Sequence, residues 1–248
     1  GSENLAVEKA VANALTMIEQ GAGLIDIGGE STRPGADPVD EQEELRRVVP
    51  VIKALRQKST IPISIDTTKA NVAREALAAG ADIINDISAF NRDPEMKQVA
   101  LETGAGCMLM HMRGTPQTMQ QFLEYNDVVT DVKAELNETI QTLLDFGIQR
   151  QSIMVDPGIG FSKNVQQNLE LIQRLDEFLE MGFPILLGTS RKSFIGKVLQ
   201  KTEPQERVWG TAATIAIGIC KGASVVRVHD IAEMKDVVDV CDAILGRM

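Results

Sequence analysis

Short apolar segments alternate with longer amphipathic segments along the whole 248-residue chain. The apolar segments predict buried strands at 24–27, 61–65, 83–87, 107–110, 153–155, 184–187 and 225–228. The amphipathic segments predict helices, among them 6–20, 43–55, 72–79, 128–146, 169–179 and 231–245. Strands and helices that alternate in this way are typical of a parallel sheet with right-handed crossovers.

Seven strands are predicted, and a helix precedes the first of them. A (β/α)₈ TIM barrel needs eight strands, each followed by a helix. We therefore predict a single-domain TIM barrel over residues 1–248 in which the first strand and its loop are absent from the sequence. The rival is an open, doubly wound sheet of seven strands. The barrel is favoured because polar residues follow nearly every strand, as in barrel active sites.

A natural barrel without one strand would expose two unpaired strand edges, which is an aggregation hazard. We therefore expect that the natural protein has the strand and that this sequence has lost it. A chain acting without it is expected to retain part of its ligand binding and to turn over weakly or not at all.

The composition narrows the functional classes. A formal charge of −10 and a pI near 4.8 argue against a nucleic-acid partner, which would need a clustered basic surface. No apolar run approaches the roughly 18 residues that cross a bilayer, so no membrane partner is expected. Three cysteines without C-x-x-C spacing are typical of the reducing cytoplasm, with neither a disulfide framework nor a zinc site.

Polar side chains gather at the predicted carboxyl ends of the strands, where barrels build their active sites. They are Asp26, Glu30 to Arg33, Asp66 to Thr68, Asn85, Asp86, His111, Arg113, Asp156, Thr189 to Ser193, Arg227, His229 and Asp230. Both histidines of the chain belong to this set. The set predicts that the functional site lies at this end of the barrel.

Several of these residues also have a purely structural interpretation. Asp66 could form a turn, and Asp156 precedes Pro157-Gly158, a common turn opener. His111 is as consistent with a structural histidine as with a ligand-binding one. Asp230, with Glu233 three residues later, is typical of a helix N-cap. Asp26 lies inside its strand and receives no assignment.

Two strand-to-helix connections are suited to anions. "GTSRKSFIG" (188–196) does not match a nucleotide-triphosphate loop, but it places Lys192 and Ser193 near a helix N-terminus. In "VRVHD" (226–230), Arg227 and His229 alternate with valines and so point to one face before the last helix. We predict an anion site there. The glycine-rich "DPGIGF" loop carries Phe161 and is either a lid or a turn.

Seven motifs, in order, resemble those of the dihydropteroate synthases, the folate-pathway enzymes that sulfonamides inhibit. They are "GGESTRPG", "SIDTTKA", "INDI", "LMHMRGTPQTMQ", "DPGIGFSKN", "GTSRKSFIG" and "VRVHD". The resemblance implies a TIM barrel, a homodimer and Mg²⁺. It also implies condensation of 6-hydroxymethyl-7,8-dihydropterin pyrophosphate with 4-aminobenzoate to give dihydropteroate and pyrophosphate.

The resemblance also assigns residues. It implies that the pterin is bound by Asp66, Asn85, Ile87, Met110, Asp156, Gly188 and Lys192, and the pyrophosphate by Thr32, Arg227 and His229. It implies that Arg33, Pro34, Phe161 and Ser193 bind 4-aminobenzoate. Asp66, Lys192, Arg227 and His229 would support a dissociative transfer without a protein nucleophile.

The sequence departs from the family at its start, where members carry a loop of the type N-x-T-P-D-S-F-S-D-G-G. The Asn of that loop helps to hold Mg²⁺, so the resemblance assigns no metal ligand within this chain. Two other functions stay open: a pterin-binding methyltransferase with a corrinoid partner, and a catalytically silent pterin-binding barrel. "STRPG" and "SRKS" count against the methyltransferase, and Lys192, Arg227 and His229 count against the silent barrel.

Overall fold

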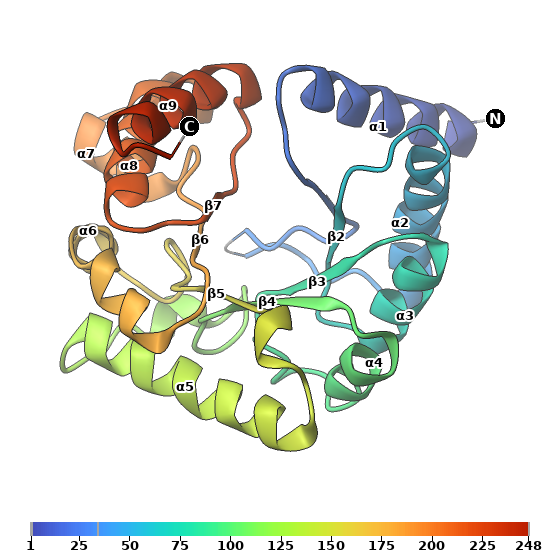
Figure 1. The fold of residues 1–248 in the computed structure, drawn as a ribbon, viewed down its shortest axis with the longest axis horizontal. Coiled ribbons are helices and arrows are strands. Elements are labelled where there is room, and N and C mark those ends of the chain that lie inside the picture. The colour runs from blue at the N-terminus through green and yellow to red at the C-terminus, as the bar shows by residue number, and fades with distance from the viewer. Residues whose placement is uncertain (1, 34, 248) are drawn as a thin grey trace.

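The computed structural model describes residues 2–33 and 35–247, and in these it has seven short parallel strands inside a ring of helices (Figure 1). The strands are β1 (Ile25–Gly28), β2 (Ile63–Asp66), β3 (Ile83–Asp86), β4 (Gly106–Met110), β5 (Ile153–Asp156), β6 (Leu186–Leu187) and β7 (Val225–Val226). Each coincides with a predicted strand, although several are shorter than expected.

The strands pair in chain order. Parallel pairing runs from β1 through β5, a bridge joins Val155 to Ile185, and β6 pairs with β7. A doubly wound sheet would reverse its strand order at a switch point, and this order contains no reversal. The predicted TIM barrel is therefore confirmed, and the open-sheet alternative is wrong.

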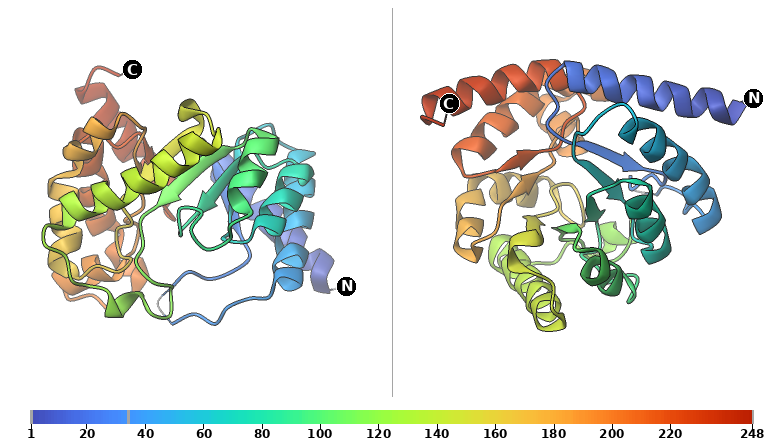
Figure 2. Two further views of the ribbon diagram at one scale, coloured as in Figure 1. Left: turned by 90° about the horizontal axis from the view of Figure 1, so that it is seen from below. Right: turned by 45° about the vertical axis from the view of Figure 1, so that its right-hand side comes forward.

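Helices follow the strands and cover them on the outside (Figures 1 and 2). They are α1 (Ser2–Glu19), α2 (Glu41–Arg56), α3 (Ala70–Ala79), α4 (Met96–Thr103), α5 (Val128–Phe146), α6 (Val165–Gln173), α7 (Ser193–Leu199), α8 (Val208–Cys220) and α9 (Ile231–Ile244). The single helix predicted at 169–179 is wrong, because α6 ends at Gln173 and a separate 3₁₀ helix, η3 (Leu175–Met181), follows. The sequence pattern of α8 has no polar face, so periodicity did not reveal it.

Glycines end several helices, as their positions predicted. Gly80 after α3 has φ 116° and Gly104 after α4 has φ 66°, both in the left-handed region. A glycine reaches this region without the strain that a Cβ would add. The chain can therefore turn sharply from helix into the next strand.

Strand register sets the level of the polar residues. Gly28 is paired with Asp66, Asp66 with Asn85, and Met110 with Asp156. Side chains along a strand point alternately into the barrel and out towards the helices. The apolar residues one position earlier, such as Ile65 and Val155, therefore point outward, and they are fully buried. The register therefore gathers the strand-end polar residues at one mouth of the barrel.

Among the described residues, β7 pairs only with β6, and β1 pairs only with β2. Helices α9 and α1 are consecutive in the ring of helices in both Figure 1 and the right-hand view of Figure 2. An ion pair spans the same interval, with Arg227 Nε 2.6 Å from Asp26 Oδ2. Side chains thus link the last strand region to the first. In the part of the chain that the structure describes, no helix has the length and apolar character to cross a membrane.

Candidate active site

A pocket opens at the carboxyl ends of the strands, and every strand or the loop after it contributes a residue. It is lined by Thr32, Asp66, Asn85, Ile87, Met110, Asp156, Phe161, Gly188, Ser190, Lys192, Arg227 and His229. All residues predicted for pterin and for pyrophosphate are in this set. Their placement around one pocket agrees with the prediction, and their roles stay predictions.

The residues predicted for 4-aminobenzoate are less completely gathered. Phe161 lines the pocket, whereas Arg33 and Ser193 are exposed and do not line it. Pro34 lies outside the described residues. The loop that carries Arg33 contacts the loop after β4, since Gln117 Nε2 donates to Ala36 O at 2.7 Å.

Asp156 combines the two interpretations that its sequence context allowed. Its Oδ1 accepts from the backbone N–H of Gly158 at 2.7 Å, so it does form the turn. The same buried side chain also lines the pocket. Burial raises the pKa of the Asp156 carboxyl, while the charge of Lys192 lowers it.

Lys192 closes another side of the pocket. Its ammonium group donates to Ile159 O and lies 4.7 Å from the centroid of the Phe161 ring. Burial lowers the pKa of Lys192 to about 8, with Asp156 opposing the shift. Phe161 is thus held by a cation–π contact at the pocket wall, and the 157–164 loop is not merely a turn.

Asp26, which received no assignment from the sequence, joins three of the strands. It accepts from Ser64 Oγ at 2.6 Å, from Asn85 Nδ2 at 3.2 Å and from Arg227 Nε at 2.6 Å. The sequence did contain a signal for this cluster: Asp26 is a carboxylate within an apolar strand, and a charge inside a barrel needs partners. Sequence reasoning saw the residue but had no means of finding those partners.

Asp66 lies beside this cluster, with its Oδ2 3.3 Å from Arg227 Nη2. Burial raises the pKa of Asp66, the neighbouring Asp26 carboxylate raises it further, and Arg227 lowers it. The two acids share one guanidinium, and the closer contact belongs to Asp26.

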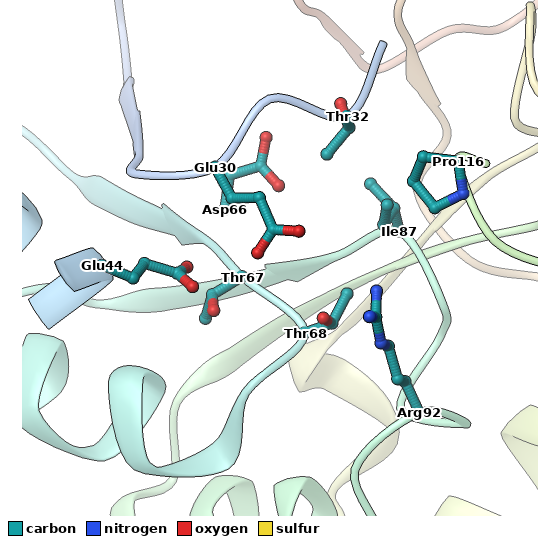
Figure 3. A pocket seen from close by; sticks show the side chains of 9 residues that line it. All are labelled: Glu30, Thr32, Glu44, Asp66, Thr67, Thr68, Ile87, Arg92 and Pro116. Atoms are coloured by element: carbon teal, nitrogen blue, oxygen red, sulfur yellow. The ribbon is translucent and has the colours of Figure 1, made fainter. Parts of the chain in front are cut away.

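Next to Asp66, a smaller recess continues the pocket towards α2 (Figure 3). Lys69 Nζ forms ion pairs with both Glu30 and Glu44 there. Glu44 is fully buried, and its Oε1 has no partner among the described residues. Figure 3 shows Thr32 and Pro116 on the other side of the recess from Glu44.

His229 and Ser190 lie at the part of the pocket where an anion is predicted to bind. Ser190 Oγ lies 3.1 Å from the backbone N of His229 and 2.9 Å from His229 Nδ1. The hydroxyl accepts from the backbone N–H of His229 and is within hydrogen-bond distance of its ring, so it fixes the position of the imidazole. Burial lowers the pKa of His229, and nearby Arg191 and Arg227 lower it further. Sequence reasoning included Ser190 at the strand end but gave it no role.

Two other strand-end residues do not face the pocket. His111 is buried, with Nε2 2.9 Å from Glu135 Oε2 and Nδ1 3.0 Å from Lys163 Nζ, which favours its structural interpretation. Arg113 also pairs with Glu135 and lies over the Tyr125 ring. The sequence left both a structural and a ligand-binding role open for His111, and these contacts favour the structural role.

The predicted N-cap is also corrected. Asp230 occupies the N-cap position of α9, but its side chain makes no capping hydrogen bond. It pairs with Arg191 instead. The bidentate attraction of a guanidinium exceeds that of one backbone N–H.

Among residues 2–33 and 35–247, no three His, Cys, Asp or Glu side chains gather as a metal-binding group. The carboxylates of Asp26 and Asp66 supply oxygen atoms beside Arg227. Mg²⁺ is often held by one or two protein oxygens together with substrate phosphates. The arrangement fits that mode rather than a site made of protein ligands alone.

Comparisons with known proteins agree on one family. The model of the pterin binding enzymes matches residues 1–229. The dihydropteroate synthase of Synechocystis sp. is 48% identical over 98% of this chain and 84% of its own length. That of Bacillus subtilis is 44% identical over 100% of this chain and 84% of its own length.

Solved structures give the same result. The Xanthomonas albilineans dihydropteroate synthase with 4-aminobenzoic acid has a TM-score of 0.92 and 41% identity, covering 97% of this chain and 85% of the other. The Yersinia pestis dihydropteroate synthase with a sulfonamide drug complex has a TM-score of 0.94 and 42% identity, covering 97% and 86%.

Proposed function

This chain belongs to the pterin binding enzymes and, within them, to the dihydropteroate synthases, and from that premise we propose how its pocket carries out the transfer. The activity is that of a transferase that condenses 6-hydroxymethyl-7,8-dihydropterin pyrophosphate with 4-aminobenzoate. The assignment of residues to substrates rests on the kinds of polar and charged group that line the pocket. Carboxyl and amide groups, from Asp66, Asn85 and Asp156, line the pocket together with Lys192, Arg227 and His229.

The pterin binds beside the carboxyl and amide groups. Its pyrimidine edge carries adjacent N–H donors, which a carboxylate such as Asp156 accepts in a fork geometry. Asn85 binds the same edge, and Lys192 donates to the ring acceptors. Ile87 and Met110 pack against the ring faces, while Gly188, beside Lys192 and Arg227, leaves room for the ring.

The diphosphate binds beside Arg227 and His229. Thr32, Arg227 and His229 are the donors, and the N-terminus of α9 follows directly. Mg²⁺ bound to the diphosphate would neutralise charge on the leaving group. We propose that the diphosphate brings most of the ligands of that ion.

The reaction is dissociative. The C–O bond to the diphosphate breaks first, and the buried carboxyls of Asp66 and Asp156 stabilise the positive charge that develops on the pterin methylene. The aniline nitrogen then attacks that carbon and loses a proton. Because no protein nucleophile is required, the rate depends on position and electrostatics.

The 4-aminobenzoate binds last, between the 157–164 loop and the loop after β1. Phe161 is already at the pocket wall, whereas Arg33, Pro34 and Ser193 are proposed to meet the ring and its carboxylate. The exposure of Arg33 and Ser193 supports a subsite that is open to solvent until the loops come together.

The named relatives favour this condensation over the methyltransferase and over the silent barrel. We further propose a homodimer. Exposed apolar side chains lie on three neighbouring helices: Val198 and Leu199 on α7, Trp209 and Ile217 on α8, Val240 and Ile244 on α9. A patch of this kind marks an interaction surface. We also propose a cytoplasmic location, which is supported by the three free thiols.

Substitution Asp156→Asn tests the proposed function. It should weaken the binding of a non-reactive pterin by about 1–3 kcal/mol, because a charge-assisted pair is replaced by a neutral contact. Isothermal titration calorimetry measures the affinity. Asp86→Asn is the matched control, since Asp86 is a buried strand-end acid that bonds only its own turn through Ser88 and Phe90.

The control should lower the melting temperature while pterin affinity stays the same. Unchanged pterin affinity in Asp156→Asn would show that Asp156 acts only as a turn former, and the proposed orientation of the pterin would be abandoned.

A further inference from the structure

Asp26 does not line the pocket, yet it contacts two residues that do. One partner, Asn85, belongs to the proposed pterin side. The other, Arg227, belongs to the proposed diphosphate side. Ser64 Oγ also donates to Asp26 Oδ1, at 2.6 Å. The side chain of Asp26 is only 12% exposed.

The contact with Asn85 selects one orientation of its amide. An ionised carboxylate only accepts hydrogen bonds, so the NH₂ group of Asn85 must face Asp26. Both Asp26 oxygens lie within reach of Nδ2, at 3.2 and 3.3 Å. The amide oxygen is left without a donor among the described residues, and it is the atom that can accept from a ligand N–H. Without Asp26, either amide orientation would be allowed.

The contact with Arg227 selects one placement of the guanidinium. Asp26 holds Nε at 2.6 Å, while Asp66 has only the longer 3.3 Å contact with Nη2. Arg227 has a half-exposed side chain, so a single partner has a large effect on where it lies. If Asp26 were neutral, Asp66 would be the remaining carboxylate for Arg227, and the guanidinium would move towards the pterin side.

We propose that Asp26 is a positioning residue that orients the Asn85 amide and the Arg227 guanidinium towards the same bound substrate, so that ring recognition and leaving-group stabilisation are aligned. This rests on the proposed function for the roles of Asn85 and Arg227. The carboxylate of Asp26 touches neither substrate. It acts through the two side chains that it holds.

The same carboxylate also influences Asp66. The charge of Asp26 raises the pKa of Asp66, second in effect only to burial.

Substitution Asp26→Asn tests the proposal, because it keeps the shape and removes the charge. We expect the affinity for inorganic pyrophosphate with Mg²⁺ to fall about 10- to 100-fold, the range for a lost charge-assisted hydrogen bond. We expect kcat to fall by a similar factor and the KM for 4-aminobenzoate to change less than threefold. Ser64→Ala is the matched control, since it removes one bond to Asp26 without touching Asn85 or Arg227; it should change pyrophosphate affinity less than threefold.

Asp26→Glu adds a charge-retaining variant. It should recover part of the pyrophosphate affinity that Asp26→Asn loses, whatever either variant does to the melting temperature. Equal losses in the Asn and Glu variants, or pyrophosphate affinity and kcat unchanged in Asp26→Asn, would overturn the proposal. Calorimetry with pyrophosphate does not depend on the orientation of the pterin. The result for Asp26 could therefore still be interpreted if Asp156→Asn left pterin affinity unchanged.

Discussion

At the scale of single residues, burial decides which titratable groups of this chain carry charge. Burial lowers the pKa of Lys163 to about 7 and that of His111 to about 4. The hydrogen bond from His111 and the contacts of Arg113 hold the pKa of Glu135 at about 2. The three groups form one chain of contacts beneath the pocket, so the network is built on a neutral histidine and an ionised glutamate.

This network predicts an acid-sensitive stability. Below pH 6.5 His111 takes up a proton in the unfolded chain, but in the folded protein it does so only near pH 4. The unfolded state therefore binds more protons between these values, and the free energy of unfolding falls as pH falls through that window. The contribution amounts to about 3 kcal/mol at most, because one pKa unit corresponds to 1.36 kcal/mol.

Urea denaturation at several values between pH 6.5 and 4.5 measures this effect. His111→Asn should be less stable than the parent at pH 6.5 and should lose less stability on acidification. Parallel stability curves for the two proteins would contradict a neutral buried His111.

At the scale of elements, the loop from β5 to α6 is the most constrained segment of the site. Tyr125 Oη donates to Ser162 O at 3.0 Å, Lys163 Nζ donates to Phe161 O at 2.9 Å, and Arg113 N donates to Ser162 Oγ at 3.0 Å. These bonds fix the loop from below, and Lys192 holds Phe161 from the side of the pocket. The loop presents its aromatic ring in a set position, which lowers the entropy lost on binding.

Gly158 tests how tightly the loop is set. Its φ is 71°, and a Cβ there would lie 1.9 Å from His111 O. This oxygen belongs to the backbone, so it cannot move away without displacing the chain around it. Gly158→Ala should therefore destabilise the protein by more than 2 kcal/mol, adding a clash to the strain of a left-handed residue (about 1 kcal/mol). It should also raise the KM for 4-aminobenzoate through Phe161.

Gly104→Ala is the matched control, because Gly104 has a similar φ of 66° and no atom within 4 Å of the added Cβ. It should lose only about 1 kcal/mol and keep its KM. Equal losses of stability in the two variants, measured by chemical denaturation, would refute the steric argument.

At the scale of the whole molecule, the ring of helices is unevenly covered. The face formed by α7, α8 and α9 exposes Trp209 at 77% and Ile244 at 76%, whereas charged residues dominate the exposed positions of α2. Water-exposed apolar area of this extent favours association, since its burial is worth about 25 cal/mol per Å². The proposed homodimer would cover this face and leave the barrel mouth, formed at the strand ends, free for substrates.

Ile217→Lys should shift the protein towards the monomer in sedimentation velocity experiments at micromolar concentration, because a buried unpaired charge opposes association. Leu101→Lys is the control, since Leu101 is also exposed, at 41%, but belongs to α4, which lies across the ring of helices from α8 in Figure 1. A parent protein that sediments as a monomer, or an equal effect of both variants, would rule out this interface.

Local patterns were enough to predict the positions of the seven strands, the barrel and the residues that meet at its mouth. Apolar runs and glycine stops depend on near neighbours in the chain, and parallel pairing brings all strand ends to one side. Contacts between distant residues were beyond that reasoning. The bond between Asp26 and Arg227 joins residues 201 positions apart, and the partners of His111 and Asp230 were decided by helices and loops that pack against them. The contact between Asp26 and Arg227 depends on the curvature of the barrel, which brings the first and last strand regions together in space.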